Sequence, residues 1–117
     1  MIRTGQWQTD GGSYIDLMID GKNVSGFYCS IHGQPQPDEK FPIIGFVNDD
    51  LISFCCSWGD YKSMTSWCGR YGVDDNGREC IRTVWNLGRK YADKAHTIEN
   101  DFWESFIHFT GIYYLQK

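Results

Sequence analysis

The residues with the greatest capacity for chemistry are tryptophans and hydroxyl-bearing side chains spread along the chain. Trp58, Trp67 and Trp85 can form apolar walls, and Ser13 and Tyr28 can donate hydrogen bonds between those walls. Sites for small molecules are built in this way, from aromatic surfaces with a few placed polar groups. The residue types therefore favour recognition of a small molecule. The alternative is that the tryptophans only fill a protein core.

The sequence has no pattern typical of catalysis or metal binding. His32, His96 and His108 are scattered, with no helical or strand spacing suited to a shared metal ion. No nucleophile stands beside a base in any motif, and no Gly-rich phosphate loop is present. None of the five cysteines forms a C-x-x-C pair, and the neighbours Cys55 and Cys56 would point to opposite faces of a strand. We therefore expect no enzyme activity, no metal site and no cofactor.

Composition excludes further classes of protein. Eleven Lys and Arg against fifteen Asp and Glu give a net charge of -4, which argues against a non-specific nucleic-acid binder. No apolar run approaches the roughly 18 residues that span a bilayer, so no membrane partner is expected. No apolar signal-peptide core follows Met1. The length fits one domain over residues 1–117, and many glycine, aromatic and β-branched residues with few alanines predict an all-β domain.

Turn signals divide the chain into eight short runs rich in β-branched and aromatic residues. The segments 20–23, 48–50 and 74–77 are typical of tight hairpin turns. All three prolines lie between His32 and Pro42, which predicts a surface loop there. A second long connection is predicted over 88–101, with one helical turn at 91–96. The predicted strands cover residues 4–9, 13–19, 23–31, 40–47, 51–58, 64–73, 79–87 and 105–115.

Alternation gives each predicted strand an inward and an outward face. Ile15 and Leu17 fall on the same face as Ser13, whereas Asp16 points outward. The even number of strands and their short connections predict an eight-stranded antiparallel up-and-down β-barrel, with the first and eighth strands paired. A barrel of eight strands can hold one small ligand inside.

The same alternation separates the cysteines. We expect Cys29, Cys55 and Cys68 on the barrel exterior. Cys56 should point inward, as a free thiol packed like a small hydrophobic side chain. Because five is an odd number, at least one thiol is free or pairs between chains.

Three stretches, in order along the chain, carry motifs of one known family. Thr4-Gly5-Gln6-Trp7 followed by Gly12-Ser13 is similar to the family's opening Gly-x-Trp…Gly-Ser pattern. Gly26-Phe27-Tyr28 is similar to the Gly-x-Tyr of its third strand. The fifth to seventh strands are matched by Trp58, by Thr65-Ser66-Trp67-Cys68-Gly69-Arg70-Tyr71 and by Thr83-Val84-Trp85-Asn86-Leu87. Each motif is weak alone, but the ordered set spans nearly the whole chain and resembles the avidin family.

The resemblance implies a non-enzymatic barrel that binds biotin, assembles as a homotetramer or a dimer, and is secreted or periplasmic. Ser13 and Tyr28 match the family's donors to the ureido oxygen of biotin. Ser30 matches the hydroxyl beside a ureido nitrogen. The remaining matches are Thr65 facing the thiophene sulfur, Ser63 at the carboxylate, Trp58, Trp67, Trp85 and Leu87 around the ligand, and Trp103 lent by a neighbouring subunit.

Three positions depart from the family's pattern. Thr9 stands where the family has a third ureido-oxygen donor, an Asn, and Gly11 replaces a Leu of the same turn. In its eighth strand the family has an Asp or Asn two residues after a Gly. When that Gly is aligned with Gly111, Tyr113 stands at the position of the Asp or Asn. An ungapped alignment instead puts Gly111 at this contact.

Neither alignment of the eighth strand provides a carboxylate to accept a ureido N–H. We therefore expect reversible biotin binding, weaker by the ~1–3 kcal/mol that one buried hydrogen bond typically contributes. The alternative is an avidin-shaped barrel that has lost tight biotin binding and acts as a lectin-like or protein-interaction module.

Overall fold

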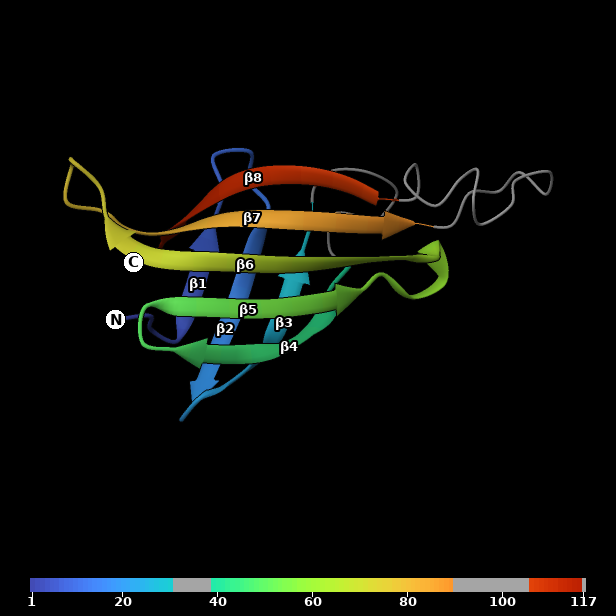
Figure 1. Cartoon of the computed structure of the whole chain (residues 1–117), viewed down its shortest axis with the longest axis horizontal. Coiled ribbons are helices and arrows are strands. Elements are labelled where there is room, and N and C mark those ends of the chain that lie inside the picture. The colour runs from blue at the N-terminus through green and yellow to red at the C-terminus, as the bar shows by residue number, and fades with distance from the viewer. Residues whose placement is uncertain (31–38, 90–105, 117) are drawn as a thin grey trace.

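The computed structural model describes residues 1–30, 39–89 and 106–116, which form a closed antiparallel β-barrel (Figure 1). Each strand pairs with its neighbours in the sequence, and β8 pairs back to β1. Figure 1 shows β5 to β8 running across the view, with β1 to β3 crossing them steeply behind. The strands are β1 (Gly5–Gln8), β2 (Tyr14–Asp20), β3 (Asn23–Cys29), β4 (Phe41–Asn48), β5 (Leu51–Ser57), β6 (Ser63–Val73), β7 (Glu79–Arg89) and β8 (Phe106–Leu115). The predicted eight-stranded up-and-down barrel is confirmed.

The predicted strand ends lie within two residues of the observed ones, but the loop predicted to run to Pro42 was wrong at its end. Pro42 lies inside β4 and pairs with Phe27 of β3. The ladder between β4 and β5 begins only at Ile43, so the missing N–H of the proline costs no bond to β5. β7 also extends two residues beyond the predicted end at Leu87, and the helical turn predicted at 91–96 lies outside the described residues.

The inward-facing side chains of the strands form an apolar core. Ile15 and Leu17 are fully buried, while Asp16 between them is not, as alternation predicted. Other large side chains in this core that are almost completely buried include Trp7, Val24, Ile52, Phe54 and Ile81. Phe54 of this core stacks on Trp67, so the core is continuous with the aromatic side chains of the lumen.

Gly26 allows β2 and β3 to approach closely just before Tyr28. Its φ of +134° is a conformation that side-chain-bearing residues rarely adopt, and a Cβ there would lie 1.8 Å from the carbonyl oxygen of Asp16. The glycine therefore fixes the local path of β3, and with it the direction of the Tyr28 side chain.

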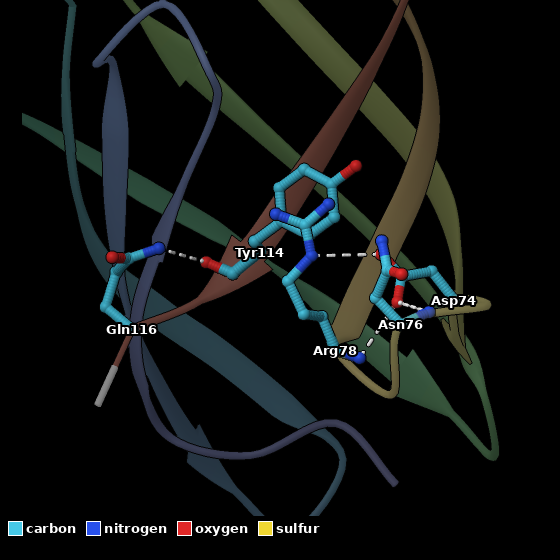
Figure 2. A network of polar contacts seen from close by, with 5 residues as sticks. All are labelled: Asp74, Asn76, Arg78, Tyr114 and Gln116. Atoms are coloured by element: carbon cyan, nitrogen blue, oxygen red, sulfur yellow. Dashed lines mark hydrogen bonds and ion pairs between the residues drawn. The ribbon is translucent and has the colours of Figure 1, made fainter.

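A polar network ties the β6–β7 hairpin to β8 at the other end of the barrel (Figure 2). Asp74 Oδ1 accepts hydrogen bonds from the backbone N–H groups of Asn76 and Arg78, both at 2.9 Å, which closes the hairpin. The Arg78 guanidinium lies 4.0 Å from the centre of the Tyr114 ring, in a cation–π arrangement. Gln116 donates to the Tyr114 carbonyl at 2.9 Å. These contacts secure the C-terminal end of β8 next to β7.

The structure describes all five cysteines, and none of them forms a disulfide. Cys56 is buried inside the barrel, as predicted, and burial raises its pKa to about 12. Cys68 is exposed and Cys55 is half-buried. The prediction of an exterior Cys29 was wrong in one respect. Cys29 lies on the outward face of β3, as alternation predicted, but its side chain is buried. Tyr14 lies opposite Cys29 on β2, covers it and forms a side-chain hydrogen bond with the thiol.

Candidate ligand-binding site

The candidate site lies in the barrel lumen, where inward-facing aromatic residues of several strands meet. The register puts Trp67 of β6 between Phe54 of β5 and Trp85 of β7. The ring centroids of Trp67 and Phe54 are 4.8 Å apart and stacked, and those of Trp67 and Trp85 are 6.5 Å apart. Trp67 also stacks with Tyr28 of β3 at 5.0 Å. Side chains from opposite sides of the barrel therefore form one aromatic layer.

Three polar groups within this layer are joined by hydrogen bonds. Trp67 Nε1 donates to Tyr113 Oη at 3.1 Å, and Tyr113 Oη lies 3.2 Å from Tyr28 Oη. Ser13, which precedes β2 and is buried, also forms a side-chain hydrogen bond with Tyr28. The structure thus brings together four residues that the sequence analysis assigned to a site, from both ends of the chain.

Burial keeps the two tyrosine hydroxyls of this network neutral. Desolvation raises the pKa of Tyr28 above its ordinary value, although hydrogen bonds with Tyr113 and Ser13 oppose the shift. Desolvation likewise raises the pKa of Tyr113, and the nearby Tyr28 adds to this effect. Both side chains are therefore neutral phenols over the usual pH range.

A second pair, Trp58 and Thr65, lies beside this network. Trp58 Nε1 donates to Thr65 Oγ1 at 2.8 Å, and both residues are buried. The Trp58 backbone N–H donates to the Ser63 carbonyl at 3.0 Å, which anchors Trp58 between β5 and β6 just before the 3₁₀ turn η1 (Gly59–Tyr61). The ring of Trp58 meets those of Tyr28 and Phe41 edge-on, at 5.3 and 4.9 Å.

The lumen becomes more exposed toward one end of β7 and β8. Trp85 is half-buried and stacks on Phe109, with ring centroids 4.5 Å apart. Phe109 faces inward in the alternation of β8, yet 46% of it is exposed. Ser63 and Leu87, at the same end of β6 and β7, are also half-buried. A ligand in the lumen would therefore reach solvent past these residues.

The structure describes two of the three remaining residues assigned to the site. Thr9 closes the β1–β2 turn, because both its backbone N–H and its hydroxyl donate to the Ser13 carbonyl, at 2.9 and 3.3 Å. Ser30 follows the end of β3 and is half-buried. Trp103 lies outside the described residues.

No group of three His, Cys, Asp or Glu side chains that could hold a metal ion occurs in residues 1–30, 39–89 and 106–116. The same residues contain no helix that is long and apolar enough to cross a membrane.

The sequence model of the avidin family matches residues 2–106, most of the chain. The chain belongs to the avidin family. Proteins of this family are binding proteins and not enzymes. Avidin-related protein 4/5 of chicken (Gallus gallus) is 22% identical over 100 residues, which cover 80% of this chain and 67% of the relative.

Solved structures of other avidins share the fold. A rhizavidin–biotin complex is similar with a TM-score of 0.80 at 24% identity, covering 100% of this chain and 97% of rhizavidin. Xenavidin is similar with a TM-score of 0.80 at 19% identity, covering 97% and 96%. A biotin-binding protein from chicken has a TM-score of 0.79 at 20% identity, covering 97% and 95%. At these identities the likeness concerns the fold.

Sequence reasoning missed three aromatic residues of this avidin-family lumen. Phe54 was not assigned to the site, although it stacks on Trp67. Phe41 and Phe109 were not assigned at all, yet they contact Trp58 and Trp85. The pairing of neighbouring strands would have identified Phe41 and Phe109. Phe41 lies opposite Tyr28, and Phe109 lies opposite Trp85.

Proposed function

We propose that the chain binds biotin in the barrel lumen, between the tryptophan side chains and the hydroxyl donors. The observation that carries this proposal is the hydrogen-bonded pair Ser13 and Tyr28, buried beside Trp58 and Trp67. A urea carbonyl oxygen accepts hydrogen bonds from hydroxyl groups, and such bonds contribute most where water is excluded. Membership of the avidin family supports the choice of ligand, as does the likeness to rhizavidin in its complex with biotin.

Each residue has a proposed role in this complex. Ser13 and Tyr28 donate to the ureido oxygen, and Thr9 contributes mainly by holding the turn that carries Ser13. Ser30 and Tyr113 lie beside the ureido nitrogens, Thr65 faces the sulfur and Ser63 contacts the carboxylate. Trp58, Trp67, Trp85 and Leu87 line the ligand, and Trp103 of a neighbouring subunit completes the site.

Calorimetric titration of the purified chain with biotin tests the proposal, together with the variants Tyr28→Phe and Tyr114→Phe. Tyr28→Phe should weaken binding by roughly 1–3 kcal/mol, the typical effect of removing one buried hydrogen-bond partner. Tyr114 is the matched control, because its ring lies on the outer face under Arg78 and its loss should leave biotin affinity unchanged. If millimolar biotin produces neither heat nor a rise in melting temperature, the proposal is wrong.

We also propose that the chain is secreted or periplasmic. We further propose that it assembles as a homotetramer, with a dimer as the smaller alternative. Outer-face residues of β7 and β8, including Val84, Thr110 and Ile112, border a solvent-open hollow of about 700 Å³, and 57% of Val84 is exposed. An exposed apolar surface of this kind is typical of association sites. Light scattering at micromolar concentration should give a multiple of 13.6 kDa, and a monomer would contradict the assembly.

The lumen's own hydrogen bonds favour one alternative function. Trp58 and Trp67 already donate their indole N–H groups to Thr65 and Tyr113, so part of the lumen is satisfied by the protein itself. A barrel of this kind can act as a lectin-like or protein-interaction module through its outer surface. Absence of biotin binding in an assembled, folded protein would support this alternative.

A further inference from the structure

Tyr113 is the centre of the hydrogen-bond network in the lumen. It lies on β8, is 2% exposed, and receives the Trp67 indole N–H at 3.1 Å. Because an indole N–H can only donate, the oxygen of Tyr113 must be the acceptor in this bond. Conjugation with the ring leaves a phenolic oxygen one strong direction for accepting a hydrogen bond, and Trp67 occupies that direction.

The neighbouring Tyr28 does not restore an acceptor at Tyr113. Their hydroxyl oxygens are 3.2 Å apart, and either can be the donor. If Tyr28 donates, Tyr113 accepts a second hydrogen bond. If Tyr113 donates, Tyr28 is the acceptor and keeps its other hydrogen bond, with Ser13. In both arrangements no strong acceptor direction is left at Tyr113. Burial raises the pKa of Tyr113, which prevents it from becoming an anionic acceptor.

Two other lumen groups have protons without acceptors in the described part of the chain. Thr65 is 3% exposed and its oxygen accepts from Trp58 at 2.8 Å, but its own hydroxyl proton has no acceptor there. The Trp85 indole N–H likewise has no acceptor, and it lies over Gly111, where a Cβ would be only 3.4 Å away. A buried donor without an acceptor is costly, so a ligand gains affinity by supplying acceptor atoms.

We propose that Tyr113 determines which class of ligand the site accepts. The site donates hydrogen bonds to a cyclic carbonyl compound, and it does not require one of the two ring N–H groups of that ligand. This inference rests on the proposed function, in which Tyr28 holds the carbonyl oxygen of a cyclic urea. The nitrogens of a urea flank its carbonyl carbon, so one ring N–H then lies beside Tyr113 and finds no acceptor. A cyclic carbamate, with a ring oxygen in place of that N–H, fits the same contacts.

Competition titrations of the full chain with three ligands test the inference. The ligands are biotin and its two carbamate analogues, in which one or the other ureido N–H is replaced by oxygen. One of the two analogues should bind within about threefold of biotin, since the replaced N–H has no partner. Binding of biotin with more than tenfold discrimination against both analogues would overturn this inference alone. Binding of none of the three would overturn the proposed function and the inference with it.

The variant Tyr113→Asn adds a test of the residue itself, because an amide oxygen can accept the ureido N–H. We expect discrimination between biotin and the tolerated carbamate to rise to tenfold or more in this variant. Tyr114→Phe, on the opposite face of the same strand, should keep the wild-type preference. A folded Tyr113→Asn protein with an unchanged preference would contradict the role of Tyr113. If this variant does not fold, the titrations of the unaltered chain still decide the question.

Discussion

Replacement of Thr65 by valine should destabilise the barrel through one identifiable hydrogen bond. Thr65 Oγ1 is the acceptor of the Trp58 indole N–H at 2.8 Å, and the two residues are 3% and 9% exposed. Valine has nearly the same shape as threonine, so the substitution creates little cavity. Its main effect is to leave the Trp58 N–H buried without a partner.

The expected magnitude follows from three contributions. An unsatisfied buried donor costs about 1–3 kcal/mol. Two smaller contributions oppose this loss, because valine buries an additional methyl group and removes the unpaired hydroxyl proton of Thr65. We therefore expect the free energy of unfolding to fall by about 1–2 kcal/mol, with a decrease in melting temperature of roughly 4–8 °C for a domain of this size.

Urea unfolding at a fixed protein concentration measures this loss, since association would otherwise change the apparent stability. Ser25→Ala is the control, because Ser25 is exposed on β3, away from the proposed association surface of β7 and β8, and the loss of its hydroxyl should change stability by less than about 0.5 kcal/mol. In a Trp58→Phe background the effect of Thr65→Val should largely disappear. A Thr65→Val protein as stable as the wild type, or a loss that persists in that background, would refute the reasoning.

Three further predictions concern the backbone, the alkaline limit and the thiols. Gly26→Ala should unfold the barrel or lower its melting temperature strongly, whereas Gly72→Ala, where a Cβ meets no atom within 4 Å, should not; equal melting temperatures would contradict the proposed close approach. The free energy of unfolding should fall as pH rises from about 9 toward 12, because burial raises the pKa of Cys56 from 9.0 to about 12 and the unfolded chain loses this proton first. Tyr28 and Tyr113 act in the same direction, so urea midpoints that stay constant from pH 8 to pH 11 would exclude this linkage. In the native protein a bulky thiol reagent should label buried Cys56 only on unfolding, which mass spectrometry of the labelled peptides can decide.

The fold was predictable from the sequence because strand boundaries depend on local signals. Turn residues such as Asp49, which adopts a φ of +55°, and Gly77, at +78°, mark the hairpins directly. Alternation then assigned the inward faces correctly at Ile15 and Leu17. The failures involve contacts between strands. Pro42 is tolerated in β4 because the β4–β5 ladder starts after it, and Cys29 is buried because of Tyr14 on another strand.

The sequence predicted that several candidate residues share one lumen, but it did not predict how they interact. Alternation and resemblance selected Ser13, Tyr28, Trp67 and Tyr113, and the structure joins these four side chains. Neither argument indicated that the hydroxyl of Thr9 would bond to the backbone of its own turn. Phe109 was missed because its contact with Trp85 depends on the register of β7 and β8. That register depends on residues that lie far apart in the chain.

The hydrogen-bond character of the lumen is decided by which of its side chains pair with one another. Trp67 donates to Tyr113 and Trp58 donates to Thr65, so two oxygens that composition alone would count as acceptors are already engaged. A shift of about one ångström in either ring would release an oxygen and favour a different ligand, because hydrogen bonds weaken steeply beyond normal contact distance. Residue types can therefore identify a polar, aromatic lumen, whereas the ligand that fits it depends on pairings that only the folded barrel fixes.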